Sequence, residues 1–255
     1  MTQQSEFQEL TALVTGASRG IGAETAFALA KHGAFTLVHY HTGESQAAAV
    51  LERIRQAGGD GALLAADLSD TDGIHEFLER LRQTGRPIDI LVNNAGSLIQ
   101  RTLFLDLTED LWNRVFVLNL TSAFLISQAV LRGMAERKRG VIVNVSSAAA
   151  RNGGGIGATA YAASKGAMSL MTKGMAKEFG PLGIRINAVS PGVIDTDYHR
   201  NFSSAAVLEG VIKATPVGRL GTSDEVADVI VFLSSPAARF IQGQVIEVNG
   251  GLLMV

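Results

Sequence analysis

The sequence contains no cysteine, which excludes disulfide bonds and a cysteine nucleophile. Its five histidines are scattered, and none of them falls in a metal-binding spacing such as His-Glu-x-x-His. The 22 basic residues nearly balance the 24 acidic ones, so the net charge of −2 gives no basic footprint for nucleic acid. Met1 to Glu9 include no apolar signal core, and no apolar run reaches the roughly 18 residues of a membrane span. From these absences we expect a cytoplasmic protein without a metal, nucleic-acid or membrane partner.

What is present is a chain of 255 residues, 47% hydrophobic and 18% charged, which is enough for a sizeable core. Short apolar runs alternate with helical segments, a pattern typical of βαβ units and parallel sheets. The predicted strands are residues 10–14, 35–40, 62–66, 88–92, 141–145, 184–189 and 245–248, and a continuous helix is predicted over 108–137. No linker or repeat divides the chain. We therefore expect one α/β domain, residues 1–255, with a Rossmann-like, doubly wound parallel sheet of about seven strands flanked by helices.

A glycine-rich segment, Thr15-Gly-Ala-Ser-Arg-Gly-Ile-Gly22, lies between the first predicted strand and the first predicted helix. Glycine permits a tight turn and a close approach to a pyrophosphate. The helix N-terminus then offers free N–H groups and a favourable dipole. The alternative is a plain strand-to-helix turn built from small residues. The position after the first strand of an alternating chain favours phosphate binding.

A second segment, Ser147 to Lys165, follows the predicted strand 141–145 and leads into a helix that reaches about Phe179. Tyr161 and Lys165 are four residues apart, so they share one face of that helix. A phenol has a reference pKa of about 10, which a neighbouring ammonium lowers. A serine hydroxyl can hold a substrate oxygen within reach of the phenol. This combination suits proton transfer on a carbonyl or alcohol, and the alternative is a surface tyrosine and lysine on an ordinary helix.

These two segments, together with others in the same order, resemble the short-chain dehydrogenase/reductase family. The matching motifs are Thr15 to Gly22, Asn93-Asn94-Ala95-Gly96, Asn119, Ser147, Tyr161-x-x-x-Lys165 and Pro191-Gly192. The resemblance extends from about Leu10 to Gly251, which is nearly the whole chain. Within the family, the chain is most similar to the 3-oxoacyl-carrier-protein reductase group and to its sugar and polyol dehydrogenase relatives.

The resemblance implies four catalytic residues. Tyr161 would exchange the proton of the substrate oxygen, and Lys165 would lower the pKa of Tyr161 and bind the cofactor ribose. Ser147 would orient the substrate oxygen; it matches better than Ser146, although the interval to Tyr161 is one residue longer than usual in the family. Asn119 would hold a water that links Lys165 to solvent, and the alternative is a buried helix asparagine bonded to the backbone.

The resemblance also implies where a nicotinamide cofactor binds. Asp67 would hydrogen-bond the adenine, the alternative being a helix N-cap. The amides of Asn93 to Gly96 would fix strand ends and contact the cofactor ribose, and the division between these two roles is open. Pro191 to Ile194 would position the carboxamide, with Thr196 near the phosphates. The predicted cofactor contacts are Gly16, Ser18, Arg19, Gly20, Ile21, Gly22, Tyr40, His41, Asp67, Leu68, Asn93, Ala95, Gly96, Tyr161, Lys165, Pro191, Gly192, Ile194 and Thr196.

The end of the second strand indicates which cofactor is used. An acid at this position would bind the ribose 2′-hydroxyl and repel a 2′-phosphate. The chain instead has Tyr40 between His39 and His41, and no acid appears before Glu44. Arg19 can offer a guanidinium to a phosphate. We therefore expect NADP(H) in preference to NAD(H), although the second arginine that many NADP-dependent relatives carry after Tyr40 is missing.

The C-terminal third is expected to cover the substrate and to form subunit contacts. The segment from Asp195 to Thr215 matches the family's substrate lid. Arg151, Asn152 and residues 98–101 either face the pocket or are solvated loop residues. The tail from Leu252 to Val255 is too apolar for a free end, so it packs in its own core or across a subunit boundary. The resemblance implies a homotetramer.

Together these inferences predict an NADP(H)-dependent oxidoreductase that transfers a hydride between nicotinamide and a carbonyl or alcohol substrate, similar to a 3-oxoacyl-thioester reductase. The alternative is an NAD(P)-dependent sugar, polyol or other alcohol dehydrogenase. A non-catalytic cofactor-sensing protein would usually lack the tyrosine or the lysine, and both are present. A lyase or epimerase on the same scaffold would need further catalytic residues, for which the sequence gives no sign.

Overall fold

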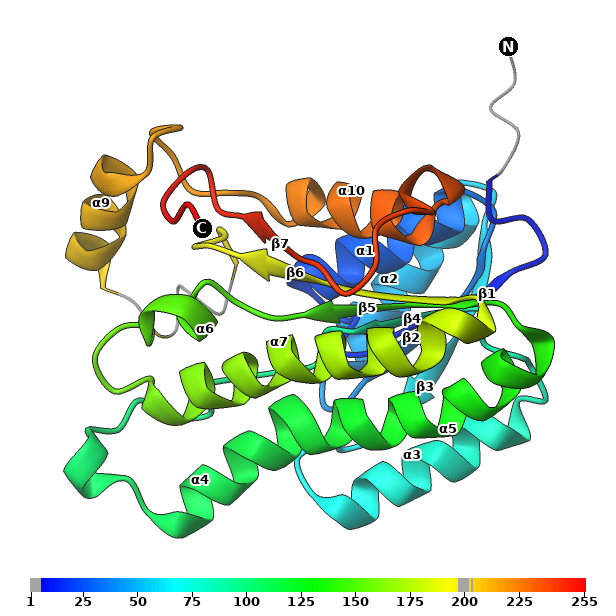
Figure 1. Ribbon diagram of the computed structural model, residues 1–255, viewed down its shortest axis with the longest axis horizontal. Coiled ribbons are helices and arrows are strands. Elements are labelled where there is room, and N and C mark those ends of the chain that lie inside the picture. The colour runs from blue at the N-terminus through cyan, green and yellow to red at the C-terminus, as the bar shows by residue number, and fades with distance from the viewer. Residues whose placement is uncertain (1–5, 197–201, 203) are drawn as a thin grey trace.

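Seven parallel strands form the central sheet, in the order β3-β2-β1-β4-β5-β6-β7 (Figure 1). The computed structural model describes residues 6–196, 202 and 204–255. The strands are β1 (Thr11–Val14), β2 (Phe35–Tyr40), β3 (Asp60–Ala65), β4 (Ile90–Asn93), β5 (Gly140–Val145), β6 (Ile184–Pro191) and β7 (Val245–Val248). All seven predicted strands are therefore confirmed, with ends that differ by at most two residues.

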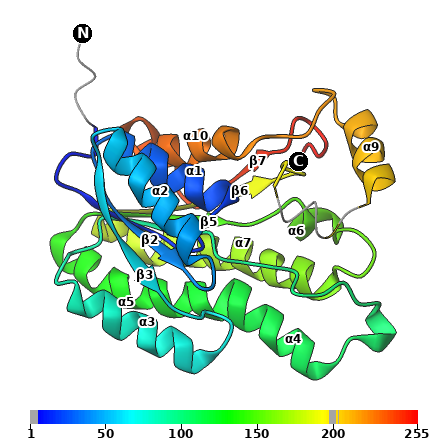
Figure 2. The same cartoon turned by 180° about the vertical axis from the view of Figure 1, so that it is seen from behind.

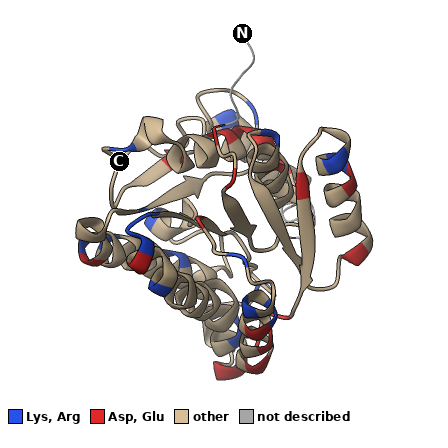
Figure 3. Ribbon diagram, turned by 90° about the vertical axis from the view of Figure 1, so that its right-hand side faces the viewer, with Lys and Arg blue, Asp and Glu red and all other residues tan. Residues whose placement is uncertain are grey.

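Helices cover both faces of this sheet, as the doubly wound prediction requires (Figure 2). The first face carries α1 (Gly20–Lys31), α2 (Glu44–Gln56) and α10 (Ser223–Ser234), and the second carries α3 (Thr71–Gln83), α5 (Ser122–Arg137) and α7 (Thr159–Phe179). Two apolar cores result, one on each side of the strands. Figure 3 shows the charged residues mainly on helices and loops, because both faces of a parallel sheet are buried.

The chain reverses its direction across the sheet between β1 and β4. Strand β1 pairs with β2 on one side and with β4 on the other. The loops that follow the carboxyl ends of β1 and β4 therefore diverge. In open α/β sheets this switch point is where ligands bind. The fold thus brings the glycine-rich segment after β1 next to the Asn93–Gly96 motif that ends β4.

The predicted helix over 108–137 is present but interrupted. It consists of α4 (Glu109–Phe116), a π-helical turn (Val117–Thr121) and α5. By length and composition, the run Glu109–Arg137 resembles a membrane span, with a mean hydropathy of 1.5 over its most apolar window. The second half of this run, α5, packs against β4, β5 and α3. Its apolar face is therefore that of a helix packed on the core.

Two short helices lie in segments for which no helix was predicted. Helix α6 (Ala149–Asn152) lies after β5 and the two serines, Ser146 and Ser147, that follow this strand. Helix α9 (Ala205–Ala214) forms part of the expected lid. Residues 197–201 and 203 of the lid lie outside the described residues. The C-terminus lies at the same end of the sheet as α6 and α9 (Figure 1).

Candidate active site

A cavity of about 760 Å³ opens at the carboxyl ends of the strands. It contains the three groups expected to act on substrate, Ser147, Tyr161 and Lys165. Most of the predicted cofactor contacts line the same cavity: Gly16, Ser18, Arg19, Gly20, Ile21, Tyr40, His41, Asp67, Leu68, Ala95, Gly96, Pro191, Gly192, Ile194 and Thr196. One continuous space therefore joins the glycine-rich segment to the tyrosine–lysine pair.

The glycine-rich segment has the backbone geometry of an anion-binding loop. Gly16 and Gly20 have φ values of +63° and +58°, which side chains other than glycine rarely adopt. A Cβ on Gly22 would lie 2.3 Å from the Gly16 carbonyl oxygen, so Gly22 permits close packing and does not line the cavity. The N-cap of α1, Arg19, makes no side-chain capping bond. The first N–H groups of α1 therefore remain available to an anion such as a pyrophosphate.

Asn94 fixes this loop in place. Its Nδ2 donates to the carbonyl oxygens of Thr15 and Gly16, at 2.9 and 3.0 Å. Asn93 behaves differently: its amide is buried and donates to Ser127 and to Asn144, at 3.0 and 2.8 Å. Asn93 does not line the cavity. Its position therefore gives no support to the predicted contact between its side chain and the cofactor. Of the two adjacent asparagines, Asn94 supports the loop and Asn93 joins β4 to its neighbours.

His39 is a second support of the loop that the sequence analysis did not single out. Its Nδ1 accepts a hydrogen bond from Gly16 N–H at 2.9 Å, and its Nε2 lies 3.2 Å from the Ala66 carbonyl oxygen. These two contacts require a neutral ring with the proton on Nε2. The ring packs edge-on against Phe77, and burial lowers the pKa of His39 to about 4. A neutral His39 thus links the glycine loop to the end of β3.

The end of β2 carries no acid that would oppose a 2′-phosphate. Tyr40, the last residue of β2, is buried, and His41 lies 3.5 Å from Asp67 (Nε2 to Oδ2). Asp67 is not a helix N-cap, because Asp70 caps α3 by accepting a bond from Gly73 N–H. Burial favours a higher pKa of Asp67, but bonds from Ser69 and the proximity of His41 outweigh it and lower the pKa. Asp67 is therefore a carboxylate at the end of the cavity where the cofactor is expected to bind.

Lys165 and Tyr161 project from α7 toward the end of β5. Lys165 is buried, donates from Nζ to the Val145 carbonyl oxygen at 2.7 Å, and lies 5.8 Å from the centroid of the Tyr161 ring. Burial lowers the pKa of Lys165 to about 8. A cation that is held at fixed distance from the phenol ring suits the role of adjusting its acidity.

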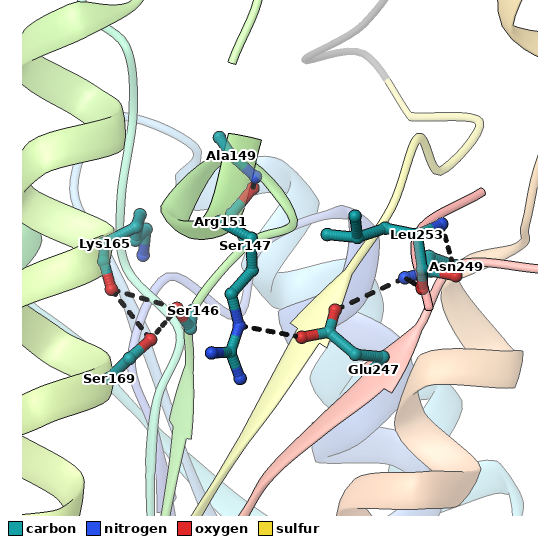
Figure 4. A network of polar contacts seen from close by, with 9 residues as sticks. All are labelled: Ser146, Ser147, Ala149, Arg151, Lys165, Ser169, Glu247, Asn249 and Leu253. Carbon is teal, nitrogen blue, oxygen red and sulfur yellow. Dashed lines mark hydrogen bonds and ion pairs between the residues drawn. The ribbon is translucent and has the colours of Figure 1, made fainter. Parts of the chain in front are cut away.

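The two adjacent serines at the end of β5 differ in their hydrogen bonds (Figure 4). Ser146 Oγ donates to the Lys165 carbonyl oxygen at 3.0 Å and lies 2.7 Å from Ser169 Oγ, so it is a buried structural group. Ser147 Oγ accepts a bond from Ala149 N–H at 3.1 Å, an interaction that does not use the serine hydrogen. This difference favours Ser147 as the hydroxyl that contacts a substrate.

Asn119 lies in the π-helical turn and is fully buried. Its Nδ2 donates to the carbonyl oxygens of Ser97 and Val115, both at 2.8 Å, and its Oδ1 accepts from Ser97 N–H at 3.1 Å. Both amide hydrogens are thus taken by the backbone, as in the alternative considered for this residue. A Cβ on Gly96 would lie 2.6 Å from Asn119 Oδ1 and 3.0 Å from Lys165 Nζ. The glycine therefore lets the asparagine and the lysine approach each other.

The C-terminal tail lines one side of the cavity through Leu252, a place that was not predicted for this apolar tail residue. Asn249 holds the tail by donating to the Leu253 carbonyl oxygen at 2.9 Å and to Glu247 at 3.3 Å (Figure 4). Glu247 in turn accepts from Arg151 Nε at 3.3 Å. Arg151 therefore ties α6 to the tail, whereas Asn152 and Arg101 line the cavity.

Comparison with known proteins agrees with this arrangement. A family model described as "Enoyl-(Acyl carrier protein) reductase" matches residues 16–253. The 3-oxoacyl-[acyl-carrier-protein] reductase FabG of Vibrio harveyi is 41% identical over 96% of this chain and 97% of that protein.

Two solved structures have the same fold. A 3-oxoacyl-[acyl-carrier protein] reductase from Brucella melitensis with bound NAD has a TM-score of 0.91 at 35% identity, over 99% of this chain and 94% of that one. A gluconate 5-dehydrogenase from Burkholderia cenocepacia J2315 in complex with NADP and tartrate has a TM-score of 0.89 at 33% identity, over 98% and 97%.

Proposed function

Because the chain belongs to the short-chain dehydrogenase/reductase family and is an NAD(P)-dependent oxidoreductase of carbonyl and alcohol groups, we propose that it uses NADP(H) and acts on 3-oxoacyl thioesters. The observation that carries the oxidoreductase chemistry is the position of Tyr161 and Lys165, which line one cavity together with the glycine loop; the similarity to 3-oxoacyl-[acyl-carrier-protein] reductases supports the substrate class. The same pair argues against a cofactor sensor without turnover. When bound, the nicotinamide supplies or accepts the hydride.

The residues of the cavity fit a dinucleotide. The uncapped N-terminus of α1 and the glycines of its loop would hold the pyrophosphate, and Asp67 would hold the adenine. Pro191 and Gly192 would lie against the carboxamide. NADP(H) is preferred because Arg19 and His41 line the adenosine end, where β2 ends in Tyr40 instead of an acid. The ratio of kcat/KM for NADPH and NADH tests this preference, and a ratio below one would reverse it.

At the other end of the cavity, the protein's own groups handle the oxygen of the substrate. Ser147 would orient that oxygen by donating its hydroxyl hydrogen. Tyr161 would give a proton to the oxygen during reduction and take it back during oxidation. The ammonium of Lys165 would make the phenol a better proton donor and acceptor at neutral pH.

The test is the substitution Tyr161→Phe, which removes only the phenolic oxygen. General acid–base groups contribute about 10²–10⁴ to rate, so turnover of a ketone should fall by about that factor while the dissociation constant for NADPH stays within a few-fold. Lys173→Gln is the matched control, because Lys173 is exposed on the same helix and lies outside the cavity. Near-normal turnover in Tyr161→Phe would overturn the assignment.

A second candidate function is the oxidation or reduction of a sugar acid, polyol or other alcohol. It is favoured by the fold shared with the gluconate 5-dehydrogenase that was solved with tartrate. A screen of 3-oxoacyl thioesters against hydroxy acids and polyols, with both cofactors, decides between the two. We also propose a homotetramer, a cytoplasmic location, and a substrate-covering role for the segment 195–215.

A further inference from the structure

The two ends of the cavity differ in charge. Asp67, Arg19 and His41 lie at the end expected to bind adenosine. At the substrate end, the described lining residues are mostly small or apolar, and they include no carboxylate. Lys165 is buried there and donates to the Val145 carbonyl oxygen, so it is held beside the Tyr161 ring and is not exposed to a remote part of a substrate. Arg101 is the exposed cation among the described residues that line the substrate end.

The guanidinium of Arg101 is held in a fixed orientation. Its Nε donates to the Phe202 carbonyl oxygen at 2.8 Å, and its Nη1 donates to the Ile156 carbonyl oxygen at 2.7 Å. The guanidinium also lies over Gly155, where a Cβ would be 3.4 Å from Nη1. These contacts join the connection after β4 to the loop that leads from Ser147 to Tyr161. They therefore hold Arg101 at the wall of the cavity that Ser147 and Tyr161 also line.

Carbonyl oxygens orient a guanidinium without neutralising its charge. A guanidinium has five N–H donors, and the two bonds to Phe202 and Ile156 use two of them, leaving Nη2 to a ligand. A planar guanidinium binds an oxyanion such as a carboxylate through charge-assisted, often bidentate, hydrogen bonds. An uncharged substrate would use none of this capacity.

We propose that Arg101 binds an anionic group, a carboxylate in the simplest case, on the part of the substrate remote from the reacting carbonyl. The enzyme then selects oxo acids or hydroxy acids over neutral ketones and alcohols of the same skeleton. This inference rests on the proposed oxidoreductase site. It also tests the choice between the two candidate substrate classes, because a 3-oxoacyl thioester has no charge near its carbonyl: a preference for acids would replace the thioester class by the sugar-acid class.

The first experiment measures selectivity during turnover. Linear oxo acids, 4-oxopentanoate, 5-oxohexanoate and 6-oxoheptanoate, are compared with their methyl esters, using NADPH as the reductant. The wild-type enzyme should prefer at least one acid over its ester by about 10- to 100-fold in kcat/KM, the range expected for a hydrogen bond to a charged group. Arg101→Gln should abolish the preference through KM of the acid, and Arg101→Lys should restore part of it.

A matched control separates the substrate end from the cofactor end. Arg19→Gln removes a cation at the adenosine end, so it should change KM for NADPH and leave the acid-to-ester ratio unchanged. Arg101→Gln keeps a donor near the position of Nε for the Phe202 carbonyl oxygen, so the loss of kcat/KM should be much larger for the acid than for the ester. An equal loss for acid and ester in Arg101→Gln would mean that Arg101 only ties the loops together, and it would overturn the proposal.

A second experiment does not depend on turnover. Calorimetric titration of the NADP⁺-loaded enzyme compares tartrate with threitol, its neutral counterpart. Tartrate should bind more tightly than threitol, and Arg101→Gln should weaken tartrate binding at least 10-fold. Equal binding of tartrate by wild type and Arg101→Gln would refute the anion site. Reduction of the esters with no preference for any acid would also refute it, while leaving the proposed oxidoreductase function intact.

Discussion

The neutral state of His39 makes a prediction about stability against pH. His39 is a free imidazole in the unfolded chain, with a pKa of about 6.5, whereas in the folded protein burial lowers that pKa to about 4. Between these values the unfolded chain binds one proton more than the folded chain at this position. The free energy of unfolding therefore falls as the pH drops from about 6.5 to about 4, and this contribution is fully present above pH 6.5.

The size of the effect follows from the two pKa values. At about 1.4 kcal/mol per pKa unit, the difference between about 6.5 and about 4 gives a loss of about 3 kcal/mol. Protonation would also turn Nδ1 into a donor that faces the Gly16 N–H, so the glycine loop would lose its acceptor. The pH dependence of stability and the geometry of the cofactor loop thus depend on the same ring.

Two substitutions separate these roles. In His39→Asn, the amide oxygen can replace Nδ1 as acceptor for Gly16, and in His39→Gln the amide nitrogen can replace Nε2 as donor to Ala66. Neither side chain titrates, so both variants should lose the histidine's share of the pH dependence. Only His39→Gln leaves the Gly16 N–H without its partner, and its affinity for NADPH should be about 10-fold lower than that of His39→Asn.

Urea unfolding at pH 7 and pH 4.5 measures the first effect, with the fluorescence of the single tryptophan, Trp112, as the probe. The protein concentration is kept constant, because the stability of an oligomer depends on it. Wild type should lose more stability than either variant between the two pH values, by about 2 to 3 kcal/mol. An identical loss in wild type and His39→Asn would refute the assignment of a neutral, buried His39.

Three further predictions concern the catalytic residues and the assembly. Gly96→Ala places a Cβ 2.6 Å from Asn119 Oδ1 and 3.0 Å from Lys165 Nζ, so kcat should fall at least about 10-fold. The control Gly174→Ala, whose Cβ would have nothing within 4 Å, should leave kcat unchanged. Equal activities of the two variants would contradict the close approach. Because the pKa of Lys165 is about 8, kcat/KM should decline above about pH 8 as the ammonium loses its proton, and a profile flat to pH 10 would contradict this role. Light scattering should give the mass of four subunits, and a monomer at micromolar concentration would argue against the tetramer.

Local patterns in the sequence were sufficient for most of the fold. Buried parallel strands appear as short apolar runs, and the glycines after β1 mark a turn that other residues cannot adopt at φ values of +63° and +58°. Tyr161 and Lys165 could be paired from the sequence because residues four apart on one helix always share a face. These features depend on neighbours in the chain, so the residues alone determine them.

Contacts between distant segments decided the remainder. The sequence cannot tell Asn93 from Asn94, because both follow the same apolar run. Strand β4 ends at Asn93, and only the packed structure shows that Asn94, just past its end, meets the glycine loop. The acceptor role of His39 depends on Gly16, 23 residues away, and the orientation of Arg101 depends on the backbone at Phe202 and Ile156. The side chain of Asn119, in the π-helical turn, likewise bonds to Ser97, 22 residues away. The amino-acid sequence by itself determined the layers and the pairing of Tyr161 with Lys165, whereas the tertiary structure decided which polar side chains support them, because hydrogen-bond partners far apart in the chain are set only by packing.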